Sequence, residues 1–225
     1  MLNVILSGGI YHPFEETSAE LTRLWAQLGV ESLVTEDVDE AIEALNDADV
    51  FSLNALRWRM LDDDKYIPFR EEWAYTLPQE HAAAIAGFIG NGGALLALHT
   101  ASICFDTWPG FKDVLGGVWQ WGRSFHPPLG PVQVRGVGSH ELGAKSLAFR
   151  CNDEIYHHLD IGADSSVLLE GCVPEGDWFP ISWLQSFGAG RVVYDGLGHD
   201  AASLKQKEHR AFLVRCCRWL LAAKR

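Results

Sequence analysis

Three of the nine histidines, His12, His99 and His199, each follow a predicted buried strand. Ligands of open α/β sheets bind beyond the carboxyl ends of the strands, so we expect these imidazoles to share one site. A neutral imidazole can ligate a divalent metal or transfer a proton near pH 7. The sequence therefore predicts either a metal centre, zinc-like or manganese-like, or a metal-free acid–base site. Taken singly, each histidine has the alternative of being a structural residue.

Two further segments carry groups suited to proton transfer. Residues 152–158 read Asn-Asp-Glu-Ile-Tyr-His-His and supply Glu154 and Tyr156. A carboxylate can orient an imidazole or act as a general acid or base. His126 lies in a loop of aromatic, glycine and proline residues at 119–128. The alternative for residues 152–158 is an exposed polar turn.

Several other kinds of site are not expected. No GxGxxG or P-loop pattern follows the first predicted strand, so we expect no bound nucleotide. The five cysteines form no CxxC pair, and their spacing suits no zinc module. We interpret them as free, buried thiols in a reducing compartment. His81 and His209 are expected on the solvated faces of helices.

The candidate site residues need a scaffold, and strands alternating with helices predict one. In the first half of the chain this alternation favours βαβ units and a parallel sheet. The very apolar strand 94–98 is expected in the middle of the sheet, and Gly188-Ala189-Gly190 predicts a hairpin. Residues 55–77 are expected to form a lid or a partner contact. The predicted strands are 2–6, 30–35, 49–53, 94–98, 131–137, 166–169, 179–186 and 191–195, and the predicted helices are 15–28, 38–45, 78–89 and 205–222.

The composition sets outer limits on function. With 225 residues, 48% of them hydrophobic, the chain is expected to fold as a single domain over residues 1–225. A net charge of −12 disfavours nucleic acid and anionic membranes as partners. The N-terminal sequence has no signal-peptide pattern and no stretch is long enough to span a membrane, so we expect a cytoplasmic protein.

A series of short motifs runs over nearly the whole chain. They are Gly8-Gly9-Ile10-Tyr11-His12-Pro13-Phe14-Glu15-Glu16-Thr17, Gly92-Gly93-Ala94-Leu95-Leu96-Ala97-Leu98-His99-Thr100-Ala101, Leu115-Gly116-Gly117, His126-Pro127-Pro128, Asp153-Glu154-Ile155-Tyr156, Pro180-Ile181-Ser182-Trp183, Gly190-Arg191-Val192-Val193-Tyr194 and Leu197-Gly198-His199-Asp200. Each motif is weak alone. Together, and in this order, they specifically resemble the ThuA-like (trehalose-utilisation) family.

The resemblance implies a three-layer, flavodoxin-like α/β fold similar to class I glutamine amidotransferases, with a mostly parallel sheet between helices. Enzymes of that superfamily carry a cysteine nucleophile at a tight turn after a central strand. The resemblance puts His99 at that turn, and Cys104 follows five residues later. An imidazole does not replace the thiolate in glutamine hydrolysis, so we expect no glutaminase activity and a dispensable Cys104.

The resemblance also implies a role in sugar utilisation. Our leading hypothesis is an enzyme that isomerises, eliminates or hydrolyses a keto-sugar or glycoside. The second is a non-catalytic protein that binds a sugar or partners a sugar oxidoreductase, with Trp58, Trp73, Trp108, Trp119 and Trp121 available for stacking; a homo-oligomer is a further expectation. We assign catalysis to His99, Glu154 and Tyr156, substrate binding to Tyr11, His126, Trp183 and Asp200, and metal binding to His12, His99 and His199.

Overall fold

The computed structural model describes residues 1–140, 142 and 146–222. Its strands are β1 (Leu2–Gly8), β2 (Glu31–Thr35), β3 (Val50–Ala55), β4 (Ala94–Leu98), β5 (Gly117–Val118), β6 (Gly130–Gly136), β7 (Ala148–Asp153), β8 (Asp160–Ile161), β9 (Ser166–Cys172), β10 (Phe179–Phe187) and β11 (Gly190–Asp195). Within these residues one large sheet has the order β2-β1-β3-β4-β11-β10-β9-β6-β7, and β5 pairs separately with β8.

One half of the large sheet, β2-β1-β3-β4-β11, is parallel. Parallel strands are covered on both faces and therefore have nearly continuous apolar sequences. All five residues of β4 are buried, and this strand lies between β3 and β11, inside the sheet as predicted. The three-layer α/β class expected from the sequence is confirmed.

The other half of the sheet is antiparallel and extends it beyond β11. β10 and β11 form the hairpin predicted at Gly188-Ala189-Gly190, and β9, β6 and β7 follow. In β6 buried and less buried residues alternate, as in a strand with one solvated face. β7 was not predicted. It leads residues 153–157 into the interior, whereas Asn152 and His158 are exposed, so most of this segment is not the exposed polar turn considered for it.

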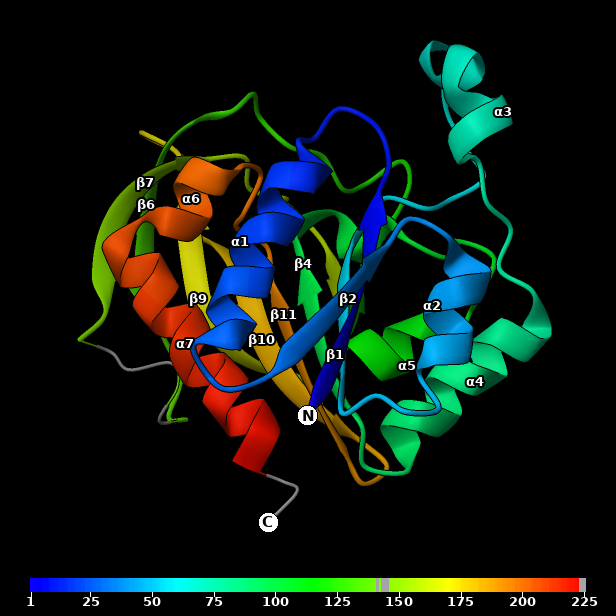
Figure 1. Cartoon of the computed structure of the whole chain (residues 1–225). Coiled ribbons are helices and arrows are strands. Elements are labelled where there is room, and N and C mark those ends of the chain that lie inside the picture. Colours follow the sequence, from blue (N-terminus) through cyan, green and yellow to red (C-terminus); the bar gives the residue numbers. More distant parts are fainter. Residues whose placement is uncertain (141, 143–145, 223–225) are drawn as a thin grey trace.

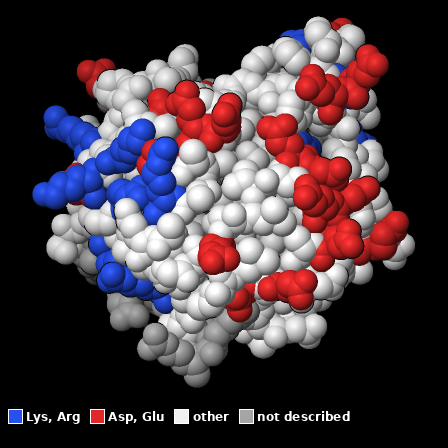
Figure 2. All heavy atoms as spheres, viewed as in Figure 1, with Lys and Arg blue, Asp and Glu red and all other residues white. Residues whose placement is uncertain are grey.

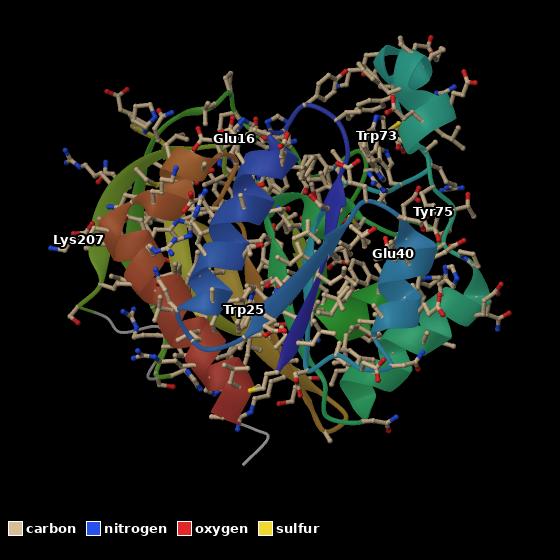
Figure 3. All side chains as sticks on the ribbon, viewed as in Figure 1. Glu16, Trp25, Glu40, Trp73, Tyr75 and Lys207 are labelled. Atoms are coloured by element: carbon tan, nitrogen blue, oxygen red, sulfur yellow. The ribbon has the colours of Figure 1, made fainter. Side chains whose placement is uncertain are left out.

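Helices cover both faces of the sheet (Figure 1). One core packs under α1, α6 and α7, and the other under α2, α4 and α5. The indole N–H of Trp25, which is labelled in Figure 3, donates from α1 to Ser52 Oγ at 3.1 Å. The helices are α1 (Phe14–Ala26), α2 (Val38–Ala44), α3 (Arg70–Trp73), α4 (Gln79–Gly90), α5 (Phe111–Leu115), α6 (Ala201–Lys205) and α7 (Lys207–Leu221), with 3₁₀ turns η1 (Asp64–Phe69) and η2 (His99–Ile103).

Residues 56–77 form an arm that carries η1 and α3 away from the body of the molecule (Figure 1). Its base is held by Arg57, whose guanidinium stacks over Trp73 at 4.4 Å and donates to the carbonyls of Ser7 and Glu36. Trp58 and Met60 are fully buried against Phe14 and other apolar residues. The expected excursion is therefore a packed structure above the carboxyl ends of β1 and β3.

His209 corrects one sequence-based expectation. We expected it on a solvated helix face, but it is completely buried on α7 and contacts the Asp195 carboxylate at 2.7 Å. The helical spacing of residues 205–222 predicted the helix, but we assigned His209 to its solvated face instead of its buried face. His81, expected to be solvated on α4, is half-buried and bonds the Tyr75 hydroxyl at 3.0 Å.

On the face of the molecule seen in Figure 2, acidic and basic side chains are unevenly distributed. Figure 2 shows acidic side chains gathered on the side of α2 and α3, and basic side chains on the side of α6 and α7. Among the described residues, no helix is both long and apolar enough to cross a bilayer.

Candidate metal or acid–base site

Three imidazoles and one carboxylate meet at the carboxyl edge of the parallel strands. One potential ligand atom from each of His12, His99, Glu154 and His199 lies within 4.8 Å of the other three. The Nε2 atoms of His12 and His99 are 3.1 Å apart, and Glu154 Oε1 is 3.7 Å from His99 Nε2. The three histidines therefore lie together, as their positions after predicted strands led us to expect.

His99 is held at the turn that follows β4. Its φ of 42° is in the left-handed region, which a non-glycine residue adopts only when the surrounding structure enforces it. The hydroxyl of Tyr194 donates to the His99 carbonyl at 2.8 Å and fixes that turn from β11. The strand-to-3₁₀ turn thereby points a buried imidazole toward the site.

His12 follows a loop that needs close backbone packing. Gly9 has a φ of 143°, and a Cβ there would lie 2.8 Å from Leu56 Cβ, so the chain passes closer to the arm than a larger residue allows. Tyr11 next to it has a φ of 65° and a side chain that is 58% exposed. Its ring meets Phe69 of the arm edge-on at 5.4 Å, at the rim of the site.

Backbone carbonyls determine which ring nitrogen of His12 and of His99 carries the proton. His99 Nδ1 lies 2.9 Å from the Gly196 carbonyl, and His12 Nδ1 lies 3.0 Å from the Ile10 carbonyl. A carbonyl only accepts, so this network assigns the proton to Nδ1 in both rings. Each Nε2 then presents a lone pair toward the other, an arrangement that is unfavourable until a cation lies between them.

Glu154 faces the histidines with one oxygen and His126 with the other. Its Oε2 lies 3.0 Å from His126 Nδ1, and its Oε1 is 3.9 Å from His12 Nε2. Burial by itself would raise the pKa of Glu154, but the hydrogen bond from His126 holds it well below its usual range. The same bond to Glu154 raises the pKa of His126.

The pKa values of His12 and His199 are lowered, whereas that of His126 is raised. Burial and the neighbouring His99 lower the pKa of His12 to about 3, so its ring is neutral at pH 7. Burial also lowers the pKa of His199. His199 Nδ1 is buried without a hydrogen-bond partner in the described part of the chain and lies 3.9 Å from Glu154 Oε1. The neutral ring of His12 thus lies beside the ionised carboxylate of Glu154.

Asp153 ties together the two segments that carry Glu154 and His199. Its buried carboxylate accepts from the backbone N–H groups of Glu154 at 2.8 Å, Gly198 at 2.9 Å and His199 at 3.2 Å. The Ser203 hydroxyl donates to it as well. Asp153 was not among the predicted site residues, because its partners are distant along the chain.

A pocket of about 250 Å³ opens beside these groups. Tyr156 is 3% exposed, and its ring lies 4.6 Å from that of His99. Burial raises the pKa of Tyr156 well above its ordinary value, so it stays a neutral phenol. Aromatic side chains of the arm and of the 119–128 loop complete the wall, namely Trp58, Tyr66, Trp119 and Trp121.

Two residues assigned to substrate binding lie elsewhere. Trp183 is fully buried in β10, stacks on Tyr194 at 4.1 Å and donates its indole N–H to the Leu115 carbonyl. Asp200 caps α6 by accepting from Ser203 N at 2.9 Å. The assignment of Trp183 is corrected, because its side chain belongs to the core, whereas Asp200 caps a helix outside the pocket and its role in binding stays a prediction. Tyr11 and His126 do line the pocket.

Cys104 lies away from the pocket of the histidine cluster. It is 2% exposed, and its thiol donates to the Ala55 carbonyl at 3.1 Å. Burial raises the pKa of the Cys104 thiol to about 12, so the thiolate needed for nucleophilic attack does not form near neutral pH.

Fold and site together define a flavodoxin-like α/β protein with a histidine-rich centre at the carboxyl edge of its parallel strands. The chain belongs to the ThuA family, whose description is trehalose utilisation and whose model matches residues 4–220. This membership indicates a carbohydrate-related role. No curated protein sequence matches the chain significantly.

Solved structures share this fold at low sequence identity. A ThuA-like protein from Parabacteroides merdae is 15% identical with a TM-score of 0.77, over 100% of this chain and 90% of that chain. A second, from Bacteroides uniformis, is 20% identical with a TM-score of 0.72, over 97% and 90%. A cytoplasmic protein from Salmonella typhimurium is 14% identical with a TM-score of 0.65, over 97% and 98%.

Proposed function

We propose that this protein is an enzyme of carbohydrate metabolism that acts on a keto-sugar or glycoside at a divalent ion held by His12, His99, His199 and Glu154. The observation that carries the proposal is the meeting of these four donors beside an aromatic pocket. The reaction is an isomerisation, an elimination or a hydrolysis.

The donor set fits a zinc-like or manganese-like ion. Two ligands that each lie ~2.0–2.1 Å from one tetrahedral ion are about 3.3 Å apart. The Nε2–Nε2 distance of 3.1 Å is close to that value, whereas the distances of 3.7 and 3.9 Å from Glu154 Oε1 to His99 and His199 are longer, so these side chains would move closer when an ion binds. Backbone carbonyls orient the rings of His12 and His99, as carbonyls commonly do for metal-binding histidines.

The ion and the residues around it would have different roles in the reaction. A divalent ion bound there would polarise a substrate carbonyl or activate a water. His126, whose hydrogen bond to Glu154 raises its pKa and favours its protonated form, is the candidate proton donor at the pocket wall. The neutral phenol of Tyr156 lies against His99 and is the second group available to hold a proton. A keto group acidifies the adjacent C–H, so one base and one electrophile suffice for proton abstraction.

Metal analysis and product analysis on untagged protein test this proposal. We expect about one zinc or manganese ion per chain, and a change in the NMR spectrum of a 3-keto-glucoside within hours. Chelator treatment should abolish the change, and the same metal should restore it. Full activity of metal-free protein would support the acid–base alternative, in which Glu154 and the histidines act directly. No spectral change with loaded protein would contradict the enzyme proposal.

A second candidate function is a sugar-binding partner of an oxidoreductase. It is favoured by exposed apolar side chains on the site loops and the arm: Tyr11 is 58%, Ile67 53% and Phe125 50% exposed. Exposed aromatic groups are enriched in protein interfaces. Sugar binding without turnover, together with a shift in elution when a sugar dehydrogenase is added, would favour this candidate over the enzyme.

A further inference from the structure

The arm of residues 56–77 is packed at its base and exposed along its outer side. Trp58 at the base is fully buried. Farther along the arm, Leu61 is 61% and Ile67 is 53% exposed, and Tyr11, whose ring contacts the arm, is 58% exposed. We call Tyr11, Leu61 and Ile67 the outer arm patch. Large apolar groups gathered at one place on a surface often mark a site of protein interaction.

The helical turns of the arm have little in this chain to pack against. η1 and α3 are six and four residues long, and neither has a fully buried side chain. They project from the body of the molecule (Figure 1). Helices of this length are marginal in water unless an apolar face packs against another surface. A partner that covers the outer arm patch would therefore stabilise the arm.

The charges of the arm favour a second copy of the chain as this partner. Two copies that each carry a net charge of −12 repel each other, so they can approach closely only through a nearly neutral surface. Residues 56–77 hold four basic and five acidic residues and are therefore nearly neutral. Both signs alternate along the arm, so the acidic groups of one arm can face the basic groups of another.

Most of these charges are not in ion pairs within one chain. Among the described residues, Arg59 Nε pairs with Asp106 at 2.9 Å. Lys65 Nζ is 3.9 Å from Asp63, and its side chain is 57% exposed. Asp64 is exposed and has no ion pair within the described part of the chain. A two-fold axis repeats each contact, so Lys65 and Asp64 of two facing arms can pair twice.

We propose that two copies of this chain pair arm to arm about a two-fold axis, with the outer arm patch buried between them. Such an interface is isologous, because the same surface of each copy faces its counterpart. The arm also supplies Trp58, Lys65 and Tyr66 to the wall of the pocket at the histidine cluster. Pairing therefore holds one wall of both sites in place. This pairing is independent of the reaction proposed for the site.

Sedimentation equilibrium of the full chain and of four point variants tests the pairing. Leu61→Glu and Ile67→Glu each place a charge in the outer arm patch, and Ile67→Arg places the opposite charge there. Val34→Glu is the matched control, because Val34 is 44% exposed on β2, outside the arm, and the variant gains the same charge. Thermal unfolding checks that each variant is folded.

We expect the wild type and Val34→Glu to form dimers with the same Kd. All three arm variants should raise the dimer Kd by at least about tenfold, because pairing would remove the new charge from water. The same loss with the acidic and the basic substitution would exclude a simple effect of net charge. A wild type that stays at 25.0 kDa at all concentrations overturns the proposal, as does a dimer whose Kd the arm variants do not change.

Hydrogen exchange at low and high protein concentration gives a readout that needs no variant. Backbone amides of residues 61–73 should exchange more slowly at the concentration at which dimers form, whereas those of β2 should not change. Concentration-dependent protection of other elements, with none on the arm, would overturn arm-to-arm pairing. A wild type that remains monomeric and binds only an added sugar dehydrogenase would also overturn it.

Discussion

His99 has a strained backbone conformation and a buried side chain, and it is also a donor of the candidate site. Its left-handed backbone and its 2% exposure are both unfavourable for an imidazole unless the surrounding contacts compensate. One of its nitrogens is satisfied by the Gly196 carbonyl, and the other faces His12. The position after β4 could be predicted from the apolar run and the motif, whereas the ring orientation depends on a carbonyl 97 residues away.

Replacing His99 tests the metal centre directly. His99→Ala removes one of four ligands, and we expect zinc affinity, measured by calorimetry with a competing chelator, to fall by at least about 100-fold. Stability of the metal-free protein should change little, because removing the ring also relieves the unfavourable contact with His12. His81→Ala on α4 is the control and should bind zinc normally. Unchanged zinc binding in His99→Ala would place the metal elsewhere.

Cys104→Ser tests whether the amidotransferase resemblance extends to chemistry. The serine hydroxyl can donate to the Ala55 carbonyl as the thiol does, so we expect a change in unfolding free energy of about 1 kcal/mol or less and full activity on sugar substrates. The folded wild type should also resist alkylation at Cys104, detected by mass spectrometry. Loss of activity with an intact fold would show that this thiol takes part in the reaction.

At the scale of elements, the strands and helices of the parallel half were predictable, because each has a continuous apolar run or helical spacing. The short apolar segments of the antiparallel half were less so. β7 reads Ala-Phe-Arg-Cys-Asn-Asp and contains three polar residues among six, so its sequence resembles a polar loop. That miss explains why Asp153 was overlooked, since its role depends on β7 ending beside the loop that carries His199.

Asp153→Asn tests this connection between β7 and that loop. An amide cannot accept from three backbone N–H groups and the Ser203 hydroxyl as a carboxylate does. We expect the fold to persist with reduced stability and the affinity for zinc to fall by about 10–100-fold, as for other residues that orient metal ligands. The absorption spectrum of the cobalt-loaded variant should also change. If the Asp153→Asn variant had a normal cobalt spectrum and normal zinc affinity, Asp153 would have a structural role only.

The contact between α7 and β11 predicts a pH dependence of stability. His209 Nδ1 faces the Ser203 carbonyl and its Nε2 faces Asp195, so both nitrogens carry protons. Burial opposes this charge, but Asp195 and the nearby Asp153 raise the pKa of His209 above its ordinary value. The stabilisation is therefore complete below the unfolded-state value of about 6.5 and is lost as pH rises through the folded-state pKa.

Urea unfolding of the wild type and His209→Gln over a pH series measures this effect. The difference in unfolding free energy between the two proteins should be largest at acidic pH and should shrink as the pH increases. Using the difference removes the contribution of His12 and His199, whose lowered pKa values act in the opposite direction. A difference that does not vary with pH would mean that His209 is neutral in the folded protein.

At the scale of the whole molecule, we predict a single cooperative domain. β4 pairs with β11, so the large sheet joins residues from both halves of the chain. The site does the same, because His12 and His99 come from the first half and Glu154 and His199 from the second. Limited proteolysis should yield no stable fragment ending near residue 130, and unfolding should show one transition. A folded fragment with that end point would contradict the prediction.

The strand order has a consequence for biosynthesis. While the ribosome is still making the chain, β4 can pair with β3 but has an open edge on its other side until residues 190–195 emerge to form β11. An open apolar edge on a nascent chain is prone to aggregation. The last donor of the cluster, His199, is synthesised just after the strand that closes this edge. Loading of an ion by all four donors would therefore require synthesis to have passed residue 199, and shorter translation products would remain empty and exposed to quality control.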